Sequence, residues 1–425
     1  MAAFEILRRV ADGAYASVLL AAKEDELTTR DRALCHELVM GVLRWQLWLD
    51  RLIQHYTARD VGQLDLSVRI ILRLGLYQLR FLTRVPASAA VNESVNLVRF
   101  ARLRSADTFV NAVLRRATRE PEVDPAANIP DPLERLAVAT SHPRWLIERW
   151  VNAFGAPEAE AFAHANNEPA PVAFRVVHSR ASESEICQRL RDAGASLVAS
   201  EIVNGAWRVS GGAAVLAQLA RAGEIYLQDE ASQLVASVVG AQAQERILDL
   251  CAAPGSKATL MADLTRDSAV IVAGDIHQHR LRTVVSSADL QRLTGIHCVT
   301  LDGLQPLSFP EGTFDRVLLD APCSGTGTLR RNPEIRWRIS PADIADLARR
   351  QTQLLFNAAQ VLKPGGRLVY STCSVEPDEN EAVVQTFLDN NERFTLSDSV
   401  RTWPHREGTD GFFVSAFARN TFGVR

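Results

Sequence analysis

Two cysteines in the last third of the chain could act as nucleophiles. Cys323 lies in Asp320-Ala-Pro-Cys-Ser-Gly-Thr-Gly327, and Cys373 lies in Ser371-Thr-Cys-Ser-Val-Glu-Pro-Asp-Glu-Asn380. A cysteine near polar N–H groups and a helix start can have a lowered pKa and react as a thiolate. Most cysteines are small buried apolar residues, but two that lie just beyond predicted strands of one sheet are less easily explained in that way.

Methylation of a pyrimidine carbon is the reaction that this pair suits. Cytosine C5 is a poor nucleophile by itself. A thiolate that adds at C6 pushes electron density onto C5, which can then attack the methyl group of a sulfonium. A base must next remove the C5 proton so that the thiolate can leave. One cysteine would add to the ring and the second group would assist release.

A turn of small residues could hold the methyl donor. Ile247-Leu-Asp-Leu-Cys-Ala-Ala-Pro-Gly-Ser-Lys257 is typical of a strand, a tight turn and the start of a helix. Small side chains let a ligand approach the backbone, and N–H groups at a helix start suit a carboxylate. The residues expected to line this loop are Cys251, Ala252, Ala253, Pro254, Gly255, Ser256 and Lys257.

Acidic residues end four successive predicted strands: Asp249, Asp275, Asp302 and Asp320. Each one alone would more often be a turn or helix cap. Together they favour a ligand with a ribose, because a carboxylate at a strand end can accept both ribose hydroxyls. The fingerprints G-x-G-x-x-G and G-x-x-x-x-G-K-[ST] are absent, which leaves S-adenosylmethionine as the expected cofactor.

The elements that must position these residues alternate between strand and helix after about residue 236. Strands are predicted at 246–250, 270–273, 298–301, 315–319 and 367–371, and helices at 257–264, 277–293, 341–362 and 378–389. Such alternation builds a doubly wound α/β sheet, with ligands at the carboxyl ends of parallel strands. The aspartates and both cysteines would therefore share one edge of the sheet.

The preceding part of the chain is organised differently. Apolar residues at three and four spacing predict helix from residue 2 to about 118, and a linker with four prolines follows at 120–132. A helix at 143–154 comes before a small α+β unit, with strands at 173–177 and 206–210 and a helix at 182–193. The expected domains are 1–130, 131–235 and 236–425.

The composition is that of an ordered, soluble protein. Of 425 residues 47% are hydrophobic and 23% charged, which excludes disordered, fibrous and membrane-spanning proteins. The formal charge of −3 neither favours nor excludes nucleic acid. Only three of the 47 basic residues are lysines, and arginine suits bidentate phosphate contacts, although a GC-rich genome produces the same bias.

Cysteine spacing and the start of the chain bear on location. The six cysteines are dispersed without a CxxC pair, which argues against a disulfide scaffold or zinc ribbon. No basic start with an apolar region, and no apolar run of membrane length, is present. We therefore expect a cytoplasmic protein. We expect no bound metal, because His277 and His279, two residues apart at a helix start, point to different faces of the helix.

The final domain resembles the NOL/NOP/Sun group of RNA cytosine-C5 methyltransferases. The resemblance lies in Asp249–Lys257, Asp320–Gly325 and Ser371–Ser374, and it covers the whole domain. It implies a class I S-adenosylmethionine methyltransferase fold, with Cys373 as nucleophile and Cys323 assisting product release. DNA cytosine methyltransferases attack with the Pro-Cys cysteine, so possession of both cysteines favours RNA.

The resemblance also implies the ligand contacts. Cofactor contacts are implied for the loop 251–257 and for Asp275, Asp302 and Asp320, and Asp320 is expected to hydrogen-bond the cytosine edge. Ser256 departs from the family pattern, in which a second glycine is usual. Tyr226–Gln233 is similar to the segment that precedes the catalytic sheet in the family.

The first domain resembles the NusB-like RNA-binding helical domain in three segments, 30–44, 91–96 and 110–116. Joined to this catalytic domain, it is similar to the RsmB/Sun (Fmu) subgroup, which methylates one cytosine of bacterial 16S rRNA. The expected partner is therefore 16S rRNA, naked or in a subribosomal particle, and nothing demands more than a monomer.

Two groups of basic residues could hold the RNA. Six arginines between 99 and 119 could track a phosphate backbone, or form an ordinary solvated helix face. Four more lie with Trp337 just after the Pro-Cys segment, where a flipped base would need aromatic and cationic support. The candidate RNA contacts are Arg99, Arg102, Arg104, Arg115, Arg116, Arg330, Arg331 and Trp337.

Other functions stay open from the sequence. The same 5-methylcytosine chemistry could act on tRNA or on another rRNA position. A non-catalytic RNA-binding or assembly factor could keep the cofactor site for folding only, although the intact cysteines and aspartates speak against it. DNA methylation would require Cys323 to be the attacking thiol.

Overall fold

The computed structural model describes residues 1–23 and 26–421, in two compact units. One unit comprises Met1–Pro169 and Leu329–Arg338, and the other comprises Ala170–Thr328 and Ile339–Arg425. The last four residues of the predicted catalytic domain, 422–425, lie outside the described range. Across the described residues, no helix combines the length and apolar character needed to span a bilayer.

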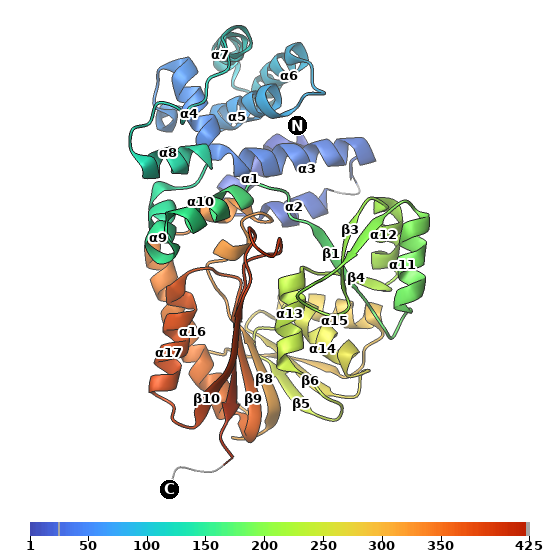
Figure 1. Ribbon diagram of the computed structural model, residues 1–425. Helices are drawn as coiled ribbons and strands as arrows, with labels where there is room; N and C mark the ends of the chain where they lie inside the picture. Colours follow the sequence, from blue (N-terminus) through green and yellow to red (C-terminus); the bar gives the residue numbers. More distant parts are fainter. Residues whose placement is uncertain (24–25, 422–425) are drawn as a thin grey trace. The chain divides into compact units, whose positions relative to one another are not determined.

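The first unit is built of helices (Figure 1), as the three and four spacing predicts. Their bounds are α1 Ala2–Ala11, α2 Ala16–Ala22, α3 Thr29–Arg44, α4 Gln46–Thr57, α5 Leu66–Phe81, α6 Ala87–Phe100, α7 Asp107–Arg119, α8 Pro132–Ala139, α9 Arg144–Phe154 and α10 Ala156–Ala165. Helix α5 lies at the centre and is capped by Asp65. Gly75 lets α5 approach its neighbours, since a Cβ there would lie 2.7 Å from Leu114.

A short segment of the catalytic sequence, 329–338, completes this helical unit. Arg336 is fully buried and donates hydrogen bonds to the carbonyl oxygen of Ser141 at 3.1 Å and to Asn167 Oδ1 at 3.0 Å. Burial lowers the pKa of Arg336 to about 9. The indole nitrogen of Trp337 donates to the carbonyl of Leu43 at 2.8 Å. The segment therefore fastens helices that are distant from it in sequence.

The second unit begins with a small antiparallel sheet in the order β2-β3-β1-β4. Its elements are β1 Val172–Val176, α11 Glu183–Asp192, β2 Ser196–Ala199, β3 Ala206–Ser210, α12 Ala213–Arg221 and β4 Ile225–Leu227. The predicted α+β unit is confirmed. Two of its strands were not predicted, because β2 is largely exposed and β4 has only three residues.

A seven-stranded sheet comes next along the chain, in the order β10-β11-β9-β8-β5-β6-β7. Its elements are α13 Glu230–Val239, β5 Arg246–Asp249, α14 Ser256–Leu264, β6 Val270–Asp275, α15 Gln278–Gln291, β7 Ile296–Thr300, β8 Phe314–Asp320, α16 Pro341–Gln360, β9 Leu362–Thr372, α17 Glu381–Asp389, β10 Phe394–Arg401 and β11 Phe413–Arg419. Strands β5 to β9 pair in parallel, which confirms the doubly wound sheet, and β10 and β11 add an antiparallel edge.

Helices cover both faces of this sheet: α13, α14 and α15 one face, α16 and α17 the other (Figure 1). Successive residues of β8 alternate between the two cores, since Leu318 packs with the first helix layer and Leu319 with the second. The predicted parallel strands β5, β6, β8 and β9 are largely buried apolar runs in the sequence. Strand β11 is also largely buried, but it was not predicted. The polar, exposed edge strand β10 has no such signal.

We predict that Arg336→Ala destabilises the protein by about 2–4 kcal/mol, because it leaves buried carbonyl groups without their donor. Urea unfolding followed by circular dichroism measures the change. Arg349→Ala is the control, since that side chain is 77% exposed and pairs with Asp346 on the surface; we expect it to cost less than about 0.5 kcal/mol. Equal unfolding midpoints for Arg336→Ala and the unmodified protein would contradict the structural role.

Candidate active site

A cavity of about 350 Å³ lies at the carboxyl ends of the parallel strands. The predicted cofactor loop, three of the aspartates and both cysteines contribute to its lining: Cys251, Ala253, Asp275, Asp302, Asp320, Cys323 and Cys373. Side chains from five separate segments therefore meet at one edge of the sheet. This convergence results from parallel pairing, which brings the ends of all these strands to the same edge.

The two thiols are in contact, with 3.3 Å between the sulfur atoms of Cys323 and Cys373. Strands β8 and β9 are neighbours, and Asp320 stands opposite Ser371, so the two cysteine loops leave the sheet side by side. The N–H of Gly327 donates to the carbonyl of Cys373 at 2.9 Å and fastens the loops to each other.

The two sulfur atoms differ in their surroundings. The hydrogen bond with Cys373, burial and the negative charge of Glu379 raise the pKa of Cys323 well above its usual range. Cys323 therefore stays a thiol and can donate a hydrogen bond to the other sulfur. That arrangement favours Cys373 over Cys323 as the attacking sulfur.

Asp320 is fixed from two sides. Lys257 Nζ lies 2.6 Å from Oδ2 of Asp320, and the hydroxyl of Ser371 donates to Oδ1 at 2.7 Å. Although burial opposes its charged form, the carboxylates of Asp320 and Asp249 raise the pKa of Lys257. The structure thus gives Lys257, expected as a cofactor contact, the direct task of orienting Asp320.

Asp249 is a buried carboxylate without a partner. It is 1% exposed, and neither side-chain oxygen has a hydrogen-bond partner among the described atoms. Burial, together with the charge of Asp320, raises its pKa to about 7. Buried polar atoms are normally satisfied, so this orphan fits a site that a hydrogen-bond donor of a ligand completes.

The loop before α14 is shaped for close approach. Gly255 has a φ of +104° and caps the helix, and a Cβ there would lie 3.0 Å from Cα of Val284. Glycine is therefore required at this position. The first N–H groups of α14 have no acceptor within the helix, and they come directly after the turn that ends at Gly255. Ser256, which replaces the family's usual glycine, is the first residue of the helix.

Arg280 is a site residue that the sequence did not reveal. It lines the cavity, donates to the carbonyl of Ala253 at 3.1 Å and lies 3.5 Å from Asp275 Oδ2. It thereby joins the cofactor loop to the acid at the end of β6. Its only sequence signal is its place in the first turns of the helix after Asp275, which many unrelated arginines share.

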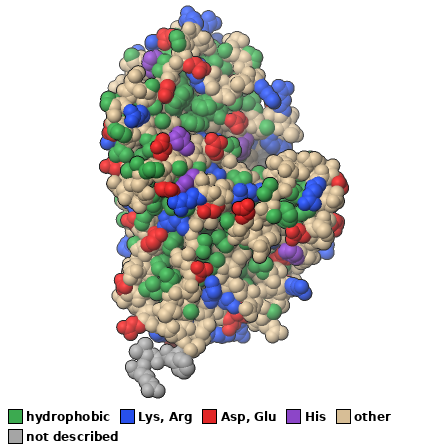
Figure 2. Space-filling view, in the orientation of Figure 1, with side chains coloured by type: hydrophobic (Ala, Val, Ile, Leu, Met, Phe, Trp, Pro, Cys, Tyr) green, Lys and Arg blue, Asp and Glu red, His purple; other side chains and the backbone are tan. Residues whose placement is uncertain are grey.

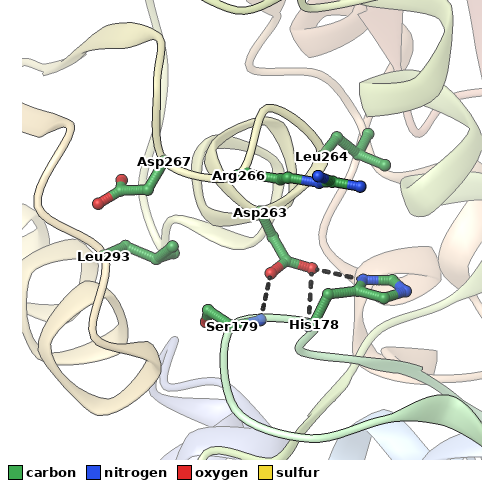
Figure 3. A pocket seen from close by; sticks show the side chains of 7 residues that line it. All are labelled: His178, Ser179, Asp263, Leu264, Arg266, Asp267 and Leu293. Carbon is green, nitrogen blue, oxygen red and sulfur yellow. Dashed lines mark hydrogen bonds and ion pairs between the residues drawn. The ribbon is translucent and has the colours of Figure 1, made fainter.

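A larger cavity of about 670 Å³ lies at the other end of α14 (Figure 3). Asp263, which is 3% exposed, accepts hydrogen bonds from His178 Nδ1 at 2.9 Å and from the N–H of Ser179 at 3.3 Å. The hydrogen bond to Asp263 raises the pKa of His178. These bonds tie the small sheet to α14. No predicted site residue lines this cavity, so the smaller, cysteine-lined cavity is the candidate active site.

The predicted RNA contacts fall into two groups. The arginines at 99, 102, 104, 115 and 116 are exposed on the α6–α7 region, where Arg99 pairs with Asp107 and Arg116 with Glu120. A cavity of about 340 Å³ between these helices is lined in part by Arg115 and Arg119. On the face in Figure 2, acidic and basic side chains are interspersed.

The second group requires a correction. Arg330 is 5% exposed, and its carbonyl accepts a hydrogen bond from Arg44. Trp337 is engaged with Leu43 through its indole nitrogen. Both pack into the helical unit. Burial of Arg330 leaves it little surface for RNA, which contradicts its expected role, whereas Trp337 is partly exposed and its role stays a prediction. Arg331 is half-buried and stays a prediction. In the described part of the chain, no group of three His, Cys, Asp or Glu side chains could hold a metal ion.

Comparison with known proteins gives matches along nearly the whole chain. The NusB family model matches residues 1–119, an RsmF/B-like ferredoxin-like domain matches 142–216, and the model of 16S rRNA methyltransferase RsmB/F matches 236–418. These matches confirm the family resemblance and the fold class that the sequence predicted.

Individual relatives match at full length. The chain is 37% identical to the probable ribosomal RNA small subunit methyltransferase B of Synechocystis sp., over 97% of both chains. It is 33% identical to the protein of the same name from Bacillus subtilis, over 96% of this chain and 95% of that one. Among solved structures, PH0851 matches 98% of this chain and 97% of its own, with a TM-score of 0.85 and 26% identity.

The unpaired carboxyl of Asp249 predicts a pH-dependent stability in the ligand-free protein. Because its folded pKa is raised, the folded state holds the proton more tightly between about pH 4 and pH 7, and stability declines as pH rises through that window. We expect the unmodified protein to lose about 2–4 kcal/mol relative to Asp249→Asn between pH 4 and pH 8.

Urea unfolding at a series of pH values measures this difference. Asp302→Asn is the control, since Asp302 also lines the cavity but is partly exposed. A difference between Asp249→Asn and the unmodified protein that does not change with pH would contradict the prediction.

Proposed function

This chain belongs to the RsmB/F family of 16S rRNA methyltransferases, and we propose that it methylates C5 of a cytosine in 16S rRNA through a covalent cysteine adduct. The contact between the thiols of Cys323 and Cys373 carries the proposal, since one sulfur can bond C6 while the other stays within reach of the same ring.

The proposed cofactor is S-adenosylmethionine, which supplies an activated methyl group when bound. The loop 251–257 and the start of α14 would receive its carboxylate, and Asp275 its ribose hydroxyls. The unpaired oxygens of Asp249 would accept hydrogen bonds from its ammonium group. Arg280, which contacts both Asp275 and Ala253, would hold the carboxylate and the cofactor loop in fixed positions relative to each other.

The chain's own residues divide the remaining tasks. Asp320, oriented by Lys257 and Ser371, accepts a hydrogen bond from the edge of the cytosine and fixes the ring over the sulfur atoms. The Cys373 thiolate forms the bond to C6, and the electron pair of the C5–C6 double bond moves to C5. After methylation, a base removes the C5 proton, the electron pair of that C–H bond restores the C5–C6 double bond, and the bond between Cys373 and C6 breaks to release the thiolate; Cys323 assists this elimination.

The N-terminal, NusB-like domain supports the proposed rRNA substrate. The exposed arginines of the NusB-like domain, Arg99, Arg102, Arg104, Arg115 and Arg116, would contact phosphates of the rRNA. The same chemistry on tRNA or another rRNA position is the alternative. Since one chain supplies every residue of the site, we propose a monomer that acts in the cytoplasm, where rRNA matures.

Substitution of the two cysteines tests the proposed function. With labelled S-adenosylmethionine and small-subunit rRNA that lacks the modification, we expect Cys373→Ala to lose all transfer, because no thiolate remains to activate C5. We expect Cys323→Ala to accumulate a protein–RNA adduct that resists denaturant. Adduct formation by Cys373→Ala would reverse the roles, and tRNA as the only methylated RNA would support the alternative substrate.

The arginine surface gives a separate prediction. The triple variant Arg102→Ala, Arg104→Ala, Arg115→Ala is expected to bind rRNA more weakly, with a salt dependence of the affinity that is lower by about 1 per lost phosphate contact. Filter binding at several salt concentrations measures this slope. Arg221→Ala, at an exposed arginine of α12, is the control; equal slopes for both variants would remove the α6–α7 surface from the interface.

A further inference from the structure

A buried glutamate bonds to both cysteine loops. Glu379 lies between β9 and α17 and is fully buried. Its Oε1 accepts hydrogen bonds from the N–H of Ser324 at 2.8 Å and from Gln351 Nε2 at 2.9 Å. Its Oε2 accepts from the hydroxyls of Ser324 and of Ser374, the latter at 2.5 Å. Both oxygens are thus fully used.

The two serines place this carboxylate next to the chemistry. Ser324 follows Cys323 directly, and Ser374 follows Cys373 directly. Their hydroxyl oxygens are 3.0 Å apart, close to the 3.3 Å that separates the two sulfur atoms. One side chain therefore bridges the loops at the position beside each thiol.

Glu379 is itself held rigidly. The hydroxyl of Tyr370, on β9, donates to the carbonyl of Glu379 at 2.5 Å. Gln351, on α16, donates through the same nitrogen to the carbonyl of Pro322 at 2.9 Å. A network in which every member is satisfied fixes the geometry of the groups that it joins.

The charge of Glu379 is costly to bury. Among the ion pairs of the described residues none includes Glu379, and its donors are all neutral. Burial of an unpaired carboxylate is unfavourable unless hydrogen bonds replace its hydration. A carboxylate accepts four hydrogen bonds here, three from the two cysteine loops and one from Gln351, and an apolar residue of the same volume could accept none.

We propose that Glu379 is a positioning residue, which holds the thiols of Cys323 and Cys373 in contact through Ser324 and Ser374. The inference rests on the proposed function, since the contact matters because Cys323 must act on an adduct that Cys373 has formed. Glu379 does not line the active-site cavity, so its loss affects the steps that need both thiols rather than cofactor binding.

A disulfide assay on the full-length protein measures the thiol contact without RNA or cofactor. Diamide takes one hydrogen from each thiol as the sulfur atoms bond, and its azo group becomes a hydrazine. The rate of the Cys323–Cys373 disulfide is read by peptide mass after alkylation. We expect Glu379→Ala to slow it about tenfold, because the loops separate.

Glu379→Gln is the matched variant. It keeps an oxygen for the N–H of Ser324 and for Gln351, and its amide can donate to the two hydroxyls. We expect a disulfide rate within about twofold of the unmodified protein. Because both variants lose the charge, their difference reports hydrogen-bonded geometry. Glu230→Ala controls for loss of a buried carboxylate that bonds to Arg208 and not to the cysteine loops.

If Glu379→Ala does not fold, the double variant Ser324→Ala, Ser374→Ala tests the same hydrogen bonds between Glu379 and the two cysteine loops. It removes both hydroxyl donors and keeps the bond from the N–H of Ser324, so we expect an intermediate rate. Equal disulfide rates in all folded variants would overturn the proposal. A rate for Glu379→Gln as low as that for Glu379→Ala would overturn it too, since charge rather than hydrogen bonding would then control the contact.

A methyl-transfer assay distinguishes failure of the positioning role of Glu379 from failure of the proposed function. We expect Glu379→Ala to lower kcat about 10- to 100-fold, with an unchanged KM for S-adenosylmethionine and an accumulating RNA adduct, and Glu379→Gln to restore turnover. Absence of transfer in the unmodified protein would refute the proposed function while the disulfide rates still decide the role of Glu379. A rise in KM with unchanged kcat would overturn the positioning role.

Discussion

The parallel pairing of β8 with β9 is the constraint on which the rest of the active site depends. It sets Asp320 opposite Ser371, so that β8 and β9 end at the same edge of the sheet and at matching positions along the two strands. The cysteine of each exit loop then meets the other at 3.3 Å. Neither loop could achieve this alone, because the contact is defined by the register of two strands that are separated by a helix of twenty residues.

Electrostatics then distinguishes groups that are chemically alike. Cys323 and Cys373 are both thiols, but the hydrogen bond with Cys373, followed by burial and the charge of Glu379, raises the pKa of Cys323. Asp249 and Asp320 are both strand-end acids, but Lys257 pairs with Asp320 at 2.6 Å and leaves Asp249 unpartnered. In the proposed mechanism, these surroundings rather than residue type distinguish Cys373 from Cys323, and Asp320, which would face the substrate, from Asp249, which would face the cofactor.

The apolar runs and the order of strands and helices were enough to predict the five parallel strands of the sheet and the edge that holds the site. Buried parallel strands are continuous apolar runs, and their ends share one edge, so the cavity that contains Asp275, Asp320 and Cys373 could be anticipated from spacing alone. The domain boundaries stay a prediction. The edge strand β10 could not be anticipated, because its exposed polar residues lack an apolar alternation.

Residues that act through tertiary contacts were not accessible in the same way. Arg280 and Glu379 are common residues in a helix and a turn, and only the folded chain shows what they touch. The burial of Arg330 could not be predicted either, because basic residues after a catalytic loop look alike in sequence whether they face RNA or pack against helices.

A trapped complex tests the central claim most directly. RNA that carries 5-fluorocytosine at the target position can accept the thiolate and the methyl group, but it has no C5 proton to lose, so the adduct should persist in the unmodified protein. Digestion and mass spectrometry then identify the attached peptide. We predict that the nucleotide is bonded to Cys373; a nucleotide on Cys323, or no covalent complex at all, would contradict the claim.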